Sequence, residues 1–316
     1  MSIQYSNYRL TQQATLLKKR WYHFLKPVHW PMWIALFAMW ACSKLPYRVM
    51  LKLGTWFGLL GMKILAKRRH IAAVNLRLCF PELSEQKREA LLRRSFASVG
   101  IGLLETGLAW WGSDQRLRRL VKHGDFASVH QAHRQGKGVL IFTGHFTTIE
   151  LGMRLTSFYI PINIMYRAQK NTLFEWMLQQ RRGRYITQSI LREDVRGMFK
   201  ALRRNQIVCY ASDQDYGPKV SVFAPFFGVP AATVTAMSKF VRRTKTPIVP
   251  AFYFRENNKY VIEMQPIVED FPSDNDLVDT TRTNGILEHA IRRCPEQYLW
   301  QHRRFKTRPP GEAYPY

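Results

Sequence analysis

The stretch from Gly136 to Gly152, GKGVLIFTGHFTTIELG, constrains the fold more than any other part of the chain. A short apolar run at 139–142 ends at Thr143-Gly144, and a segment with helical character follows. Such a run is typical of a buried parallel strand that delivers side chains to the edge of a sheet. We therefore expect an α/β fold in which ligands bind beyond the carboxyl ends of the strands.

His145 stands directly after this expected strand, and Glu150 follows five residues later, one turn inside the expected helix. From there the carboxylate could reach back to one imidazole nitrogen, which would fix the tautomer and raise the basicity of the other nitrogen. Such a pair could take a proton from a hydroxyl group. The spacing also fits a histidine that only caps a helix, so this hypothesis depends on the rest of the chain.

Beyond residue 138, apolar strand-like runs alternate with helix-like runs. We expect strands at 138–143, 162–166, 207–211, 247–254 and 259–265, and helices at 146–157, 172–182, 193–204, 231–244 and 279–293. Alternation of this kind predicts an α/β fold with a mainly parallel sheet flanked by helices. Residues 71–135 show helical spacing, and together with the sheet they define an expected domain over 71–316.

The formal charge of +26 is the outlier in the composition. It predicts an anionic partner, which could be a bilayer surface, nucleic acid, a phosphorylated substrate or an acidic protein. A nucleic-acid-binding protein would need aromatic-studded basic strands or a recognition helix, and the sequence shows neither. The four cysteines lack zinc-ligand spacing, which favours a reduced, cytosol-facing body, and Cys209 lies in an apolar run typical of a buried residue.

The N-terminal part divides into a polar segment, 1–26, and an apolar region, 27–70, which we expect to associate with a membrane. Residues 27–43 carry no formal charge and include three tryptophans, but 17 residues is short for a spanning helix, which needs roughly 20. Residues 45–65 are apolar with three basic residues, as in a helix that lies in the interface. The sequence favours attachment over a core helix and leaves open whether residues 27–43 cross the bilayer.

Polar side chains follow two further expected strands. Arg167 comes after the second strand, with Asn171 close behind. Its guanidinium could bind phosphate or stabilise an oxyanion, or it could be only a solvated arginine. Asp213 and Asp215 follow the third strand, and no third carboxylate is near them in sequence. We therefore expect no metal here, and expect this pair to bind basic side chains of the site or to close a turn.

Several segments occur in an order that resembles one protein family: GHFTTIELG, YR followed by Asn171, ASDQDYGP, VFAPFFGV and PEQYLWQHRRFKTRP. Together with LRLCFPEL and SVGIGLLETGLAWW they resemble the bacterial lipid A late acyltransferases, and most of all the Kdo-lipid IVA lauroyltransferase type. The resemblance extends from about residue 27 to the C-terminus. The family signature is a histidine, four residues, then Asp or Glu, and it falls on His145 and Glu150.

The resemblance implies an O-acyltransferase held at the cytoplasmic face of the inner membrane by a single-pass N-terminal helix. The donor would be an acyl group on acyl carrier protein, and the acceptor a hydroxyl of a 3-hydroxyacyl chain on Kdo-lipid IVA. No metal or bound cofactor is expected. The anionic phospholipid bilayer, the phosphorylated acceptor and the acidic carrier protein would then account for the positive charge. Either a lauroyl-like chain or the myristoyl-type chain of the second late addition fits.

For this reaction we expect His145 to take the hydroxyl proton, Glu150 to orient His145, and Arg167 to stabilise the oxyanion or hold phosphate. The absence of a Ser or Cys nucleophile motif favours direct transfer over an acyl-enzyme. An acyltransferase acting on glycerol phosphate is one alternative, although its acidic signature residue is usually Asp. Lipid hydrolysis by the same pair is another, and only product analysis separates it from transfer.

Five further residues are expected to serve the substrates. Asn171, Asp213 and Asp215 would position them at the carboxyl edge of the sheet. Arg303 and Arg304, in the basic C-terminal segment, could dock an anionic partner, although a solvated basic face fits them equally well.

Overall fold

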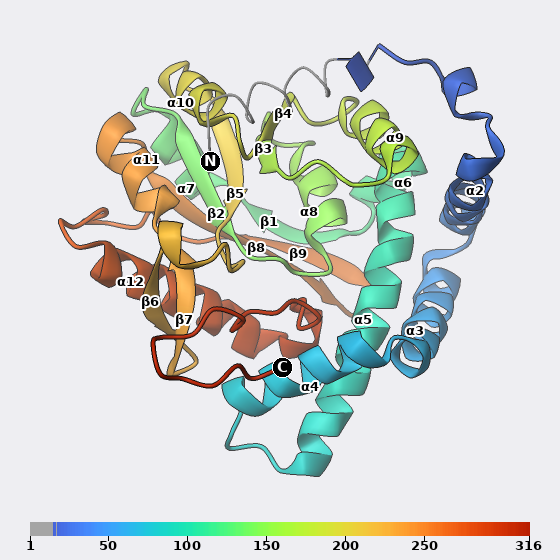
Figure 1. Cartoon of the computed structure of the whole chain (residues 1–316). Coiled ribbons are helices and arrows are strands. Elements are labelled where there is room, and N and C mark those ends of the chain that lie inside the picture. The colour runs from blue at the N-terminus through green and yellow to red at the C-terminus, as the bar shows by residue number, and fades with distance from the viewer. Residues whose placement is uncertain (1–14, 17) are drawn as a thin grey trace.

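A computed structural model describes residues 15, 16 and 18–316, which form an α/β body around a seven-stranded sheet (Figure 1). Its strands are β1 (Val121–Asp125), β2 (Val139–Thr143), β3 (Asn163–Tyr166), β4 (Gln188–Leu191), β5 (Ile207–Ala211), β8 (Ile248–Glu256) and β9 (Lys259–Met264). They lie in the order β1-β9-β8-β2-β5-β3-β4. A separate hairpin consists of β6 (Ser221–Phe226) and β7 (Val229–Val234).

The sheet is mainly parallel. Strand β2 runs parallel to both of its neighbours, β5 and β8, and β3 runs parallel to β4 and β5. Among the described strands of this sheet, only β8 and β9 pair antiparallel. Every residue of β2 is buried, as a strand covered by helices on both faces requires. The expected α/β fold with a mainly parallel sheet is therefore confirmed.

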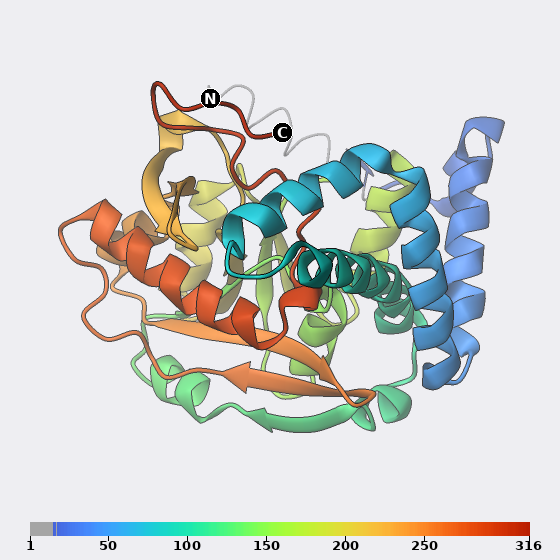
Figure 2. The same ribbon diagram turned by 90° about the horizontal axis from the view of Figure 1, so that it is seen from below.

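Helices cover both faces of the sheet and enclose two large clusters of buried apolar side chains. They are α2 (Trp30–Lys44), α3 (Tyr47–Ile64), α4 (Ala66–Cys79), α5 (Glu85–Trp111), α6 (Asp114–Arg118), α7 (Ala127–His133), α8 (Ile149–Thr156), α9 (Thr172–Arg182), α10 (Val195–Arg203), α11 (Ala236–Thr244) and α12 (Asp276–Arg293). Figure 2 looks nearly along the axis of α5, with α3 packed beside it and α2 further out.

The five expected strands are confirmed as β2, β3, β5, β8 and β9, and four of the expected helices are present as α8, α9, α10 and α12. The helix expected over 231–244 begins only at Ala236, because residues 231–234 belong to strand β7. Strand β1 was missed inside the segment read as helical, because its sequence VKHGD is polar and its burial does not alternate. Strand β4 was also missed. The hairpin β6–β7 was not among the expected strands; in it Pro225 lies opposite Pro230, and a two-stranded hairpin tolerates proline on its edges.

The N-terminal apolar region forms the helices α2, α3 and α4. Among the described residues no single helix is both long and apolar enough to cross a bilayer, and α2 has only 15 residues. Helices α3 and α4 meet the criterion only as a pair, bent by 98° at their junction. The expected spanning helix at 27–43 is thus unconfirmed, and most of the expected segment 1–26 lies outside the described residues.

Glycines allow α3 and α5 to approach each other closely. A Cβ atom on Gly100 would lie 2.1 Å from the carbonyl oxygen of Gly54, and one on Gly58 would lie 2.0 Å from that of Phe96. Neither position has room for a side chain, so backbone packs directly on backbone. The contact is extended by buried Glu105 in α5, which accepts a hydrogen bond from the Tyr47 hydroxyl of α3 at 2.6 Å.

We predict that Gly100→Ala lowers the free energy of unfolding by about 1–3 kcal/mol, because the added methyl group forces the two helices apart. Thermal unfolding in mild detergent measures the change. Gly61→Ala in α3 is the matched control, since its Cβ would meet only the tip of Leu65 at 4.0 Å. This control should be neutral or stabilising, because alanine has the higher helix propensity. Equal melting temperatures for both variants would contradict the close-packing account.

Candidate active site

The site centres on His145, which follows β2, and Asp213, which follows the neighbouring strand β5. His145 Nδ1 lies 2.5 Å from Asp213 Oδ1, and the backbone N–H of His145 donates to Asp213 Oδ2 at 2.9 Å. The Tyr298 hydroxyl donates to Oδ2 as well, also at 2.9 Å. The carboxylate is therefore fixed on both oxygens, and it orients the imidazole through Nδ1.

This arrangement shifts the pKa values of both partners. Burial acts to lower the pKa of His145, but the adjacent Asp213 carboxylate outweighs it, and the pKa lies above its ordinary value. Burial acts to raise the pKa of Asp213, yet the imidazole and the hydrogen bonds from His145 and Tyr298 bring it well below its ordinary range. The carboxylate thus stays ionised, and the imidazole is a stronger base than an isolated histidine.

Glu150 does not take the place expected for it beside the imidazole. Its carboxylate forms an ion pair with Arg182 of α9, in which Arg182 Nε lies 3.0 Å from Oε1 and Nη2 also bonds Oε2. The Trp110 indole and the Tyr185 hydroxyl donate to Oε1 at 3.0 and 2.9 Å. Because these donors occupy the Glu150 carboxylate, it is Asp213 that orients the His145 imidazole. The chain runs into helix α8 after His145, which turns Glu150 toward α9 instead.

A cavity of about 360 Å³ opens beside His145 at the carboxyl edge of the sheet. One part of its lining is apolar and comprises Ile149, Met153, Ile164 and Met165. Another part is polar and includes Arg167, Arg182, Arg192 and His302. The cavity therefore presents a base, several guanidinium groups and an apolar wall to the same volume.

Of the other expected site residues, Arg167 lines the cavity, whereas Asn171 and Asp215 make structural hydrogen bonds. Arg167 is exposed and lines the cavity, as expected. Asn171 caps helix α9 by accepting the backbone N–H of Phe174 at 3.0 Å, which is a structural task. Asp215 accepts the backbone N–H of Gly217, which closes a turn as one of the expected alternatives proposed, and also the N–H and hydroxyl of Thr307.

The two C-terminal arginines differ from each other. Arg304 is only 3% exposed and donates to Ala232 O at 2.9 Å and to Thr233 Oγ1 at 2.6 Å. It anchors the C-terminal segment on β7 and is too deeply buried for the docking role suggested by the sequence. Arg303 is partly exposed.

Sequence reasoning missed four residues of this region: Arg182, Tyr185, Tyr298 and His302. The His302 ring lies at 6.4 Å from that of His145, centroid to centroid. Desolvation, and then the neighbouring His145 imidazole, lower the pKa of His302 to about 4, so it is neutral at physiological pH. No spacing in the sequence brings these residues to the site; the C-terminal segment PEQYLWQH was visible only as part of a family resemblance.

Cys209 also lines the cavity, and burial raises the pKa of its thiol to about 12. A thiol of that pKa carries almost no thiolate at neutral pH, so it is a poor nucleophile. Within the described part of the chain no group of three or more His, Cys, Asp or Glu side chains could hold a metal ion.

A carboxylate-oriented imidazole that faces a cavity at the carboxyl edge of an α/β sheet is the arrangement of enzymes that activate a hydroxyl group or water. Sequence comparison gives the particular class. Residues 17–307 match the family of bacterial lipid A biosynthesis acyltransferases, and the chain belongs to this family.

Individual relatives are similar in sequence along almost the whole chain. The lipid A biosynthesis lauroyltransferase of Escherichia coli K12 is 38% identical over 290 residues, which are 91% of this chain and 95% of the relative. The palmitoleoyltransferase of the same organism is 38% identical, over 92% and 95% of the two chains. The myristoyltransferase of that organism is 27% identical, over 93% and 92%.

We predict that Asp213→Asn lowers the pKa of His145, because burial of the imidazole remains while the charge that raises the pKa is lost. NMR titration of the His145 ring measures this, with His145→Ala used to assign the signal. Glu150→Gln is the matched control, since Glu150 does not contribute to the His145 shift. If the pKa of His145 fell in Glu150→Gln and stayed unchanged in Asp213→Asn, the pairing of His145 with Glu150 that the sequence suggested would be supported instead.

Proposed function

We propose that this protein transfers a fatty acyl group from a thioester donor to a hydroxyl group of a lipid A precursor. The observation that carries the proposal is the His145–Asp213 pair facing a cavity with guanidinium groups and an apolar wall. Transfer of an acyl group to an alcohol needs a base, stabilisation of an oxyanion and room for an alkyl chain. Membership of the acyltransferase family supports the same reaction.

In this mechanism His145 acts through Nε2, because Nδ1 is occupied by Asp213. Nε2 takes the proton of the acceptor hydroxyl while the oxygen attacks the thioester carbonyl. The new C–O bond gives a tetrahedral intermediate, whose oxyanion Arg167 stabilises. The C–S bond then breaks, and the imidazolium returns the proton to the leaving sulfur, so the products are an ester and a thiol. Asp213 stabilises the imidazolium between these two steps.

Glu150 is assigned a positioning task in this scheme. Its ion pair fixes the Arg182 guanidinium in the wall of the cavity, where the side chain can face a phosphate or a developing negative charge. Removing one member of a buried ion pair costs about 3–5 kcal/mol, because the other charge is left buried without a partner. Glu150 therefore serves catalysis through Arg182 and not through His145.

The proposed acceptor is Kdo-lipid IVA and the proposed donor is an acyl group on acyl carrier protein, with no cofactor. Relatives are named for lauroyl, palmitoleoyl and myristoyl transfer, and the two with the higher identity of those three carry the lauroyl and palmitoleoyl names. A lauroyl-like chain is the first candidate, and the myristoyl-type second late addition is the alternative.

The proposed location is the cytoplasmic face of the inner membrane, with helices α2 and α3 in contact with the bilayer. Trp30, Ile34 and Phe37 follow one face of α2, and the last two are 70% and 65% exposed. On α3 the residues Trp56 and Ile64 are likewise exposed. Large aromatic and aliphatic side chains flanked by lysines are typical of a helix in the interface of an anionic bilayer. This contact needs no spanning helix.

We predict that wild-type protein adds one acyl group to Kdo-lipid IVA when given acyl carrier protein loaded with chains of several lengths, and that His145→Ala loses at least about 100-fold in rate. Mass spectrometry of the lipid measures the gain and identifies the chain. Undiminished transfer by the variant would remove His145 as the base. Transfer to glycerol phosphate instead, or release of free fatty acid alone, would support one of the alternative reactions.

We also predict that Ile34→Asp/Phe37→Asp releases the protein from vesicles containing phosphatidylglycerol, because two charges in the interface oppose insertion of α2. Flotation with the vesicles measures the bound fraction. The matched control is Leu277→Asp/Val278→Asp, which changes two exposed apolar residues on α12. Equal flotation of both double variants would contradict the assigned surface.

A further inference from the structure

A second cavity, of about 420 Å³, lies between α10 and α11 and is lined almost entirely by basic side chains. The cationic groove, as we call it, consists of Arg196, Phe199, Lys200, Arg203, Arg204 and Arg243. The first three basic residues of this set are spaced by four and three residues, so they project from one face of α10. All five basic side chains are exposed to solvent.

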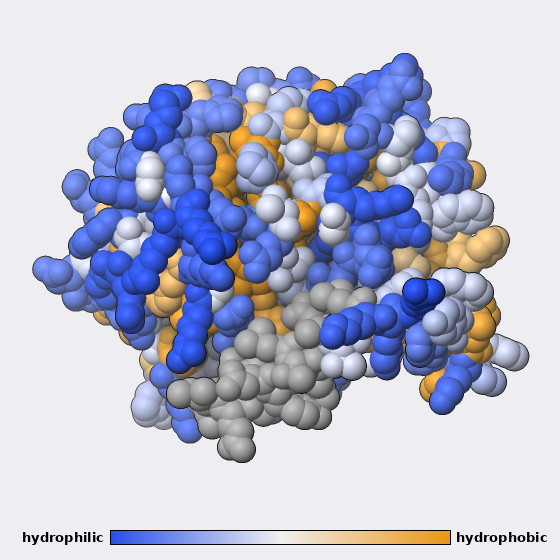
Figure 3. All heavy atoms as spheres, turned by 90° about the horizontal axis from the view of Figure 1, so that it is seen from above, coloured by the Kyte–Doolittle hydropathy of each residue, from blue (hydrophilic) through white to orange (hydrophobic). Residues whose placement is uncertain are grey.

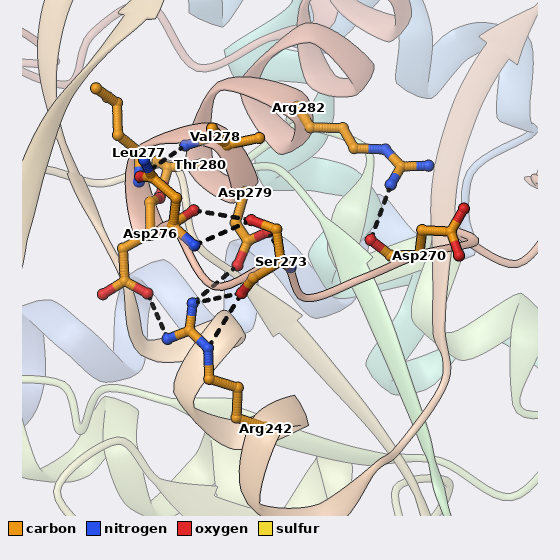
Figure 4. Close-up of polar contacts among 10 residues, drawn as sticks. Arg242, Asp270, Ser273, Asp276, Leu277, Val278, Asp279, Thr280 and Arg282 are labelled. Carbon is orange, nitrogen blue, oxygen red and sulfur yellow. Dashed lines mark hydrogen bonds and ion pairs between the residues drawn. The ribbon is translucent and has the colours of Figure 1, made fainter.

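Several other arginines of the chain have carboxylate partners, unlike those of the cationic groove. Arg242, next to Arg243, turns toward α12, where it bonds Asp276 at 2.6 Å, Asp279 at 3.2 Å and Ser273 O (Figure 4). Arg182, Arg255 and Arg293 each have a carboxylate partner too. Among the described residues, none of the five basic side chains of the groove forms an ion pair with a carboxylate.

Packing does not account for the accumulation of charge. Arg243 lies over the Phe199 ring, 5.2 Å from its centroid, and Asp194, the acidic residue nearest to Arg196 in sequence, caps α10 by accepting the backbone N–H of Gly197. Like charges gathered on one short helix repel one another and lower its stability. A bound anionic surface would remove that repulsion.

The groove begins beside the active-site cavity. Arg192 lines that cavity, and α10 starts three residues later at Val195. With 9 residues the helix is about 13 Å long at 1.5 Å per residue. Seen from above, hydrophilic side chains gather over α10 and α11 on one side of this face (Figure 3). Because α10 leads from the end of β4 back to the start of β5, its first turn, with Arg196, is the part of the groove nearest the active-site cavity.

We propose that the cationic groove is the docking surface for an acidic protein that carries the acyl donor, and that an acidic helix of that protein lies along α10. This inference rests on the proposed function, because it names the surface that delivers the donor. A bilayer is the less suitable occupant. Helices α2 and α3, which expose large apolar side chains, lie on the opposite side of the molecule from α10 and α11 (Figure 1), and the groove offers only one half-buried aromatic ring.

Docking of this kind predicts a particular kinetic pattern. Charged residues on an interface steer association and govern its salt dependence, while the chemical step is left unchanged. Loss of the groove's charge should therefore raise KM for the carrier-bound donor and leave kcat close to the wild-type value. A small donor without the acidic protein should be used equally well by both proteins.

The test compares two triple charge reversals in neutral detergent micelles. Arg196→Glu/Lys200→Glu/Arg203→Glu removes the groove, and Lys87→Glu/Arg93→Glu/Arg94→Glu is the control, with the same change of charge on exposed residues of α5. Figure 1 shows the start of α5 at the far end of the molecule from α10. Each protein receives acyl carrier protein loaded with laurate, or lauroyl-pantetheine, which is uncharged.

We expect the groove variant to raise KM for the carrier-bound donor by about tenfold or more and to leave lauroyl-pantetheine kinetics unchanged. The control should keep the wild-type values for both donors. Unchanged KM in the groove variant would overturn the proposal, as would an equal loss with both donors. A milder variant, Arg196→Gln/Lys200→Gln/Arg203→Gln, should show a smaller effect, and thermal unfolding checks that each variant folds.

Direct binding separates this inference from the proposed function. Wild-type protein should bind holo acyl carrier protein in calorimetry at low salt, with binding weakened by salt and by the groove reversal but not by the control. If wild type transfers no acyl group from either donor but binds the carrier through the groove, the proposed function fails and the docking surface stands. If it transfers acyl groups but its binding is unaffected by the groove reversal, the docking surface fails. If the groove reversal weakens binding to anionic vesicles but leaves binding to the carrier protein unchanged, the docking proposal fails and the groove is a lipid-binding surface.

Discussion

The contact between His145 and Asp213 depends on the parallel pairing of β2 with β5. The register places Thr143 opposite Ala211, so the two residues that follow these strands emerge side by side at the carboxyl edge. A carboxylate excluded from water then holds the imidazole in one orientation and raises its basicity. Most other features of the site, including the cavity beside His145 and the anchored C-terminal segment, are arranged around this pair.

How far the sequence predicts this site depends on the distance along the chain between the partners. The strand ending before His145 could be recognised, because its apolar run and the following helix are local signals. The sequence indicated that Asp213 and Asp215 would bind basic side chains of the site or close a turn, but it did not pair Asp213 with His145, since the two residues lie 68 apart and only the strand order brings them close. Glu150 was favoured because it is near in sequence, yet helix α8 directs it to Arg182. Strands β1 and β4 escaped detection because they are short and lack a clear apolar pattern.

The charged side chains of the molecule lie in three kinds of environment. Buried arginines such as Arg182 and Arg255 have carboxylate partners and join one element to another. The apolar faces of α2 and α3 expose large side chains with basic residues nearby. The cationic groove exposes unpaired charge without an apolar patch. The formal charge of +26 is therefore distributed between surfaces with different chemistry, which suits the contacts with a lipid and an acidic protein that we propose.

The C-terminal segment is the last part of the chain to be made, and it holds the loops that carry His145 and Asp213. Gln297 and Leu299 bond the backbone around His145, Tyr298 bonds Asp213, and Thr307 bonds Asp215 in the same loop. During synthesis, the imidazole and its carboxylate leave the ribosome well before the residues that fix them. The pair therefore receives its support from Tyr298 only after the C-terminal segment has folded onto this loop. A chain that ended before Tyr298 would contain His145 and Asp213 without the hydroxyl group that fixes the carboxylate.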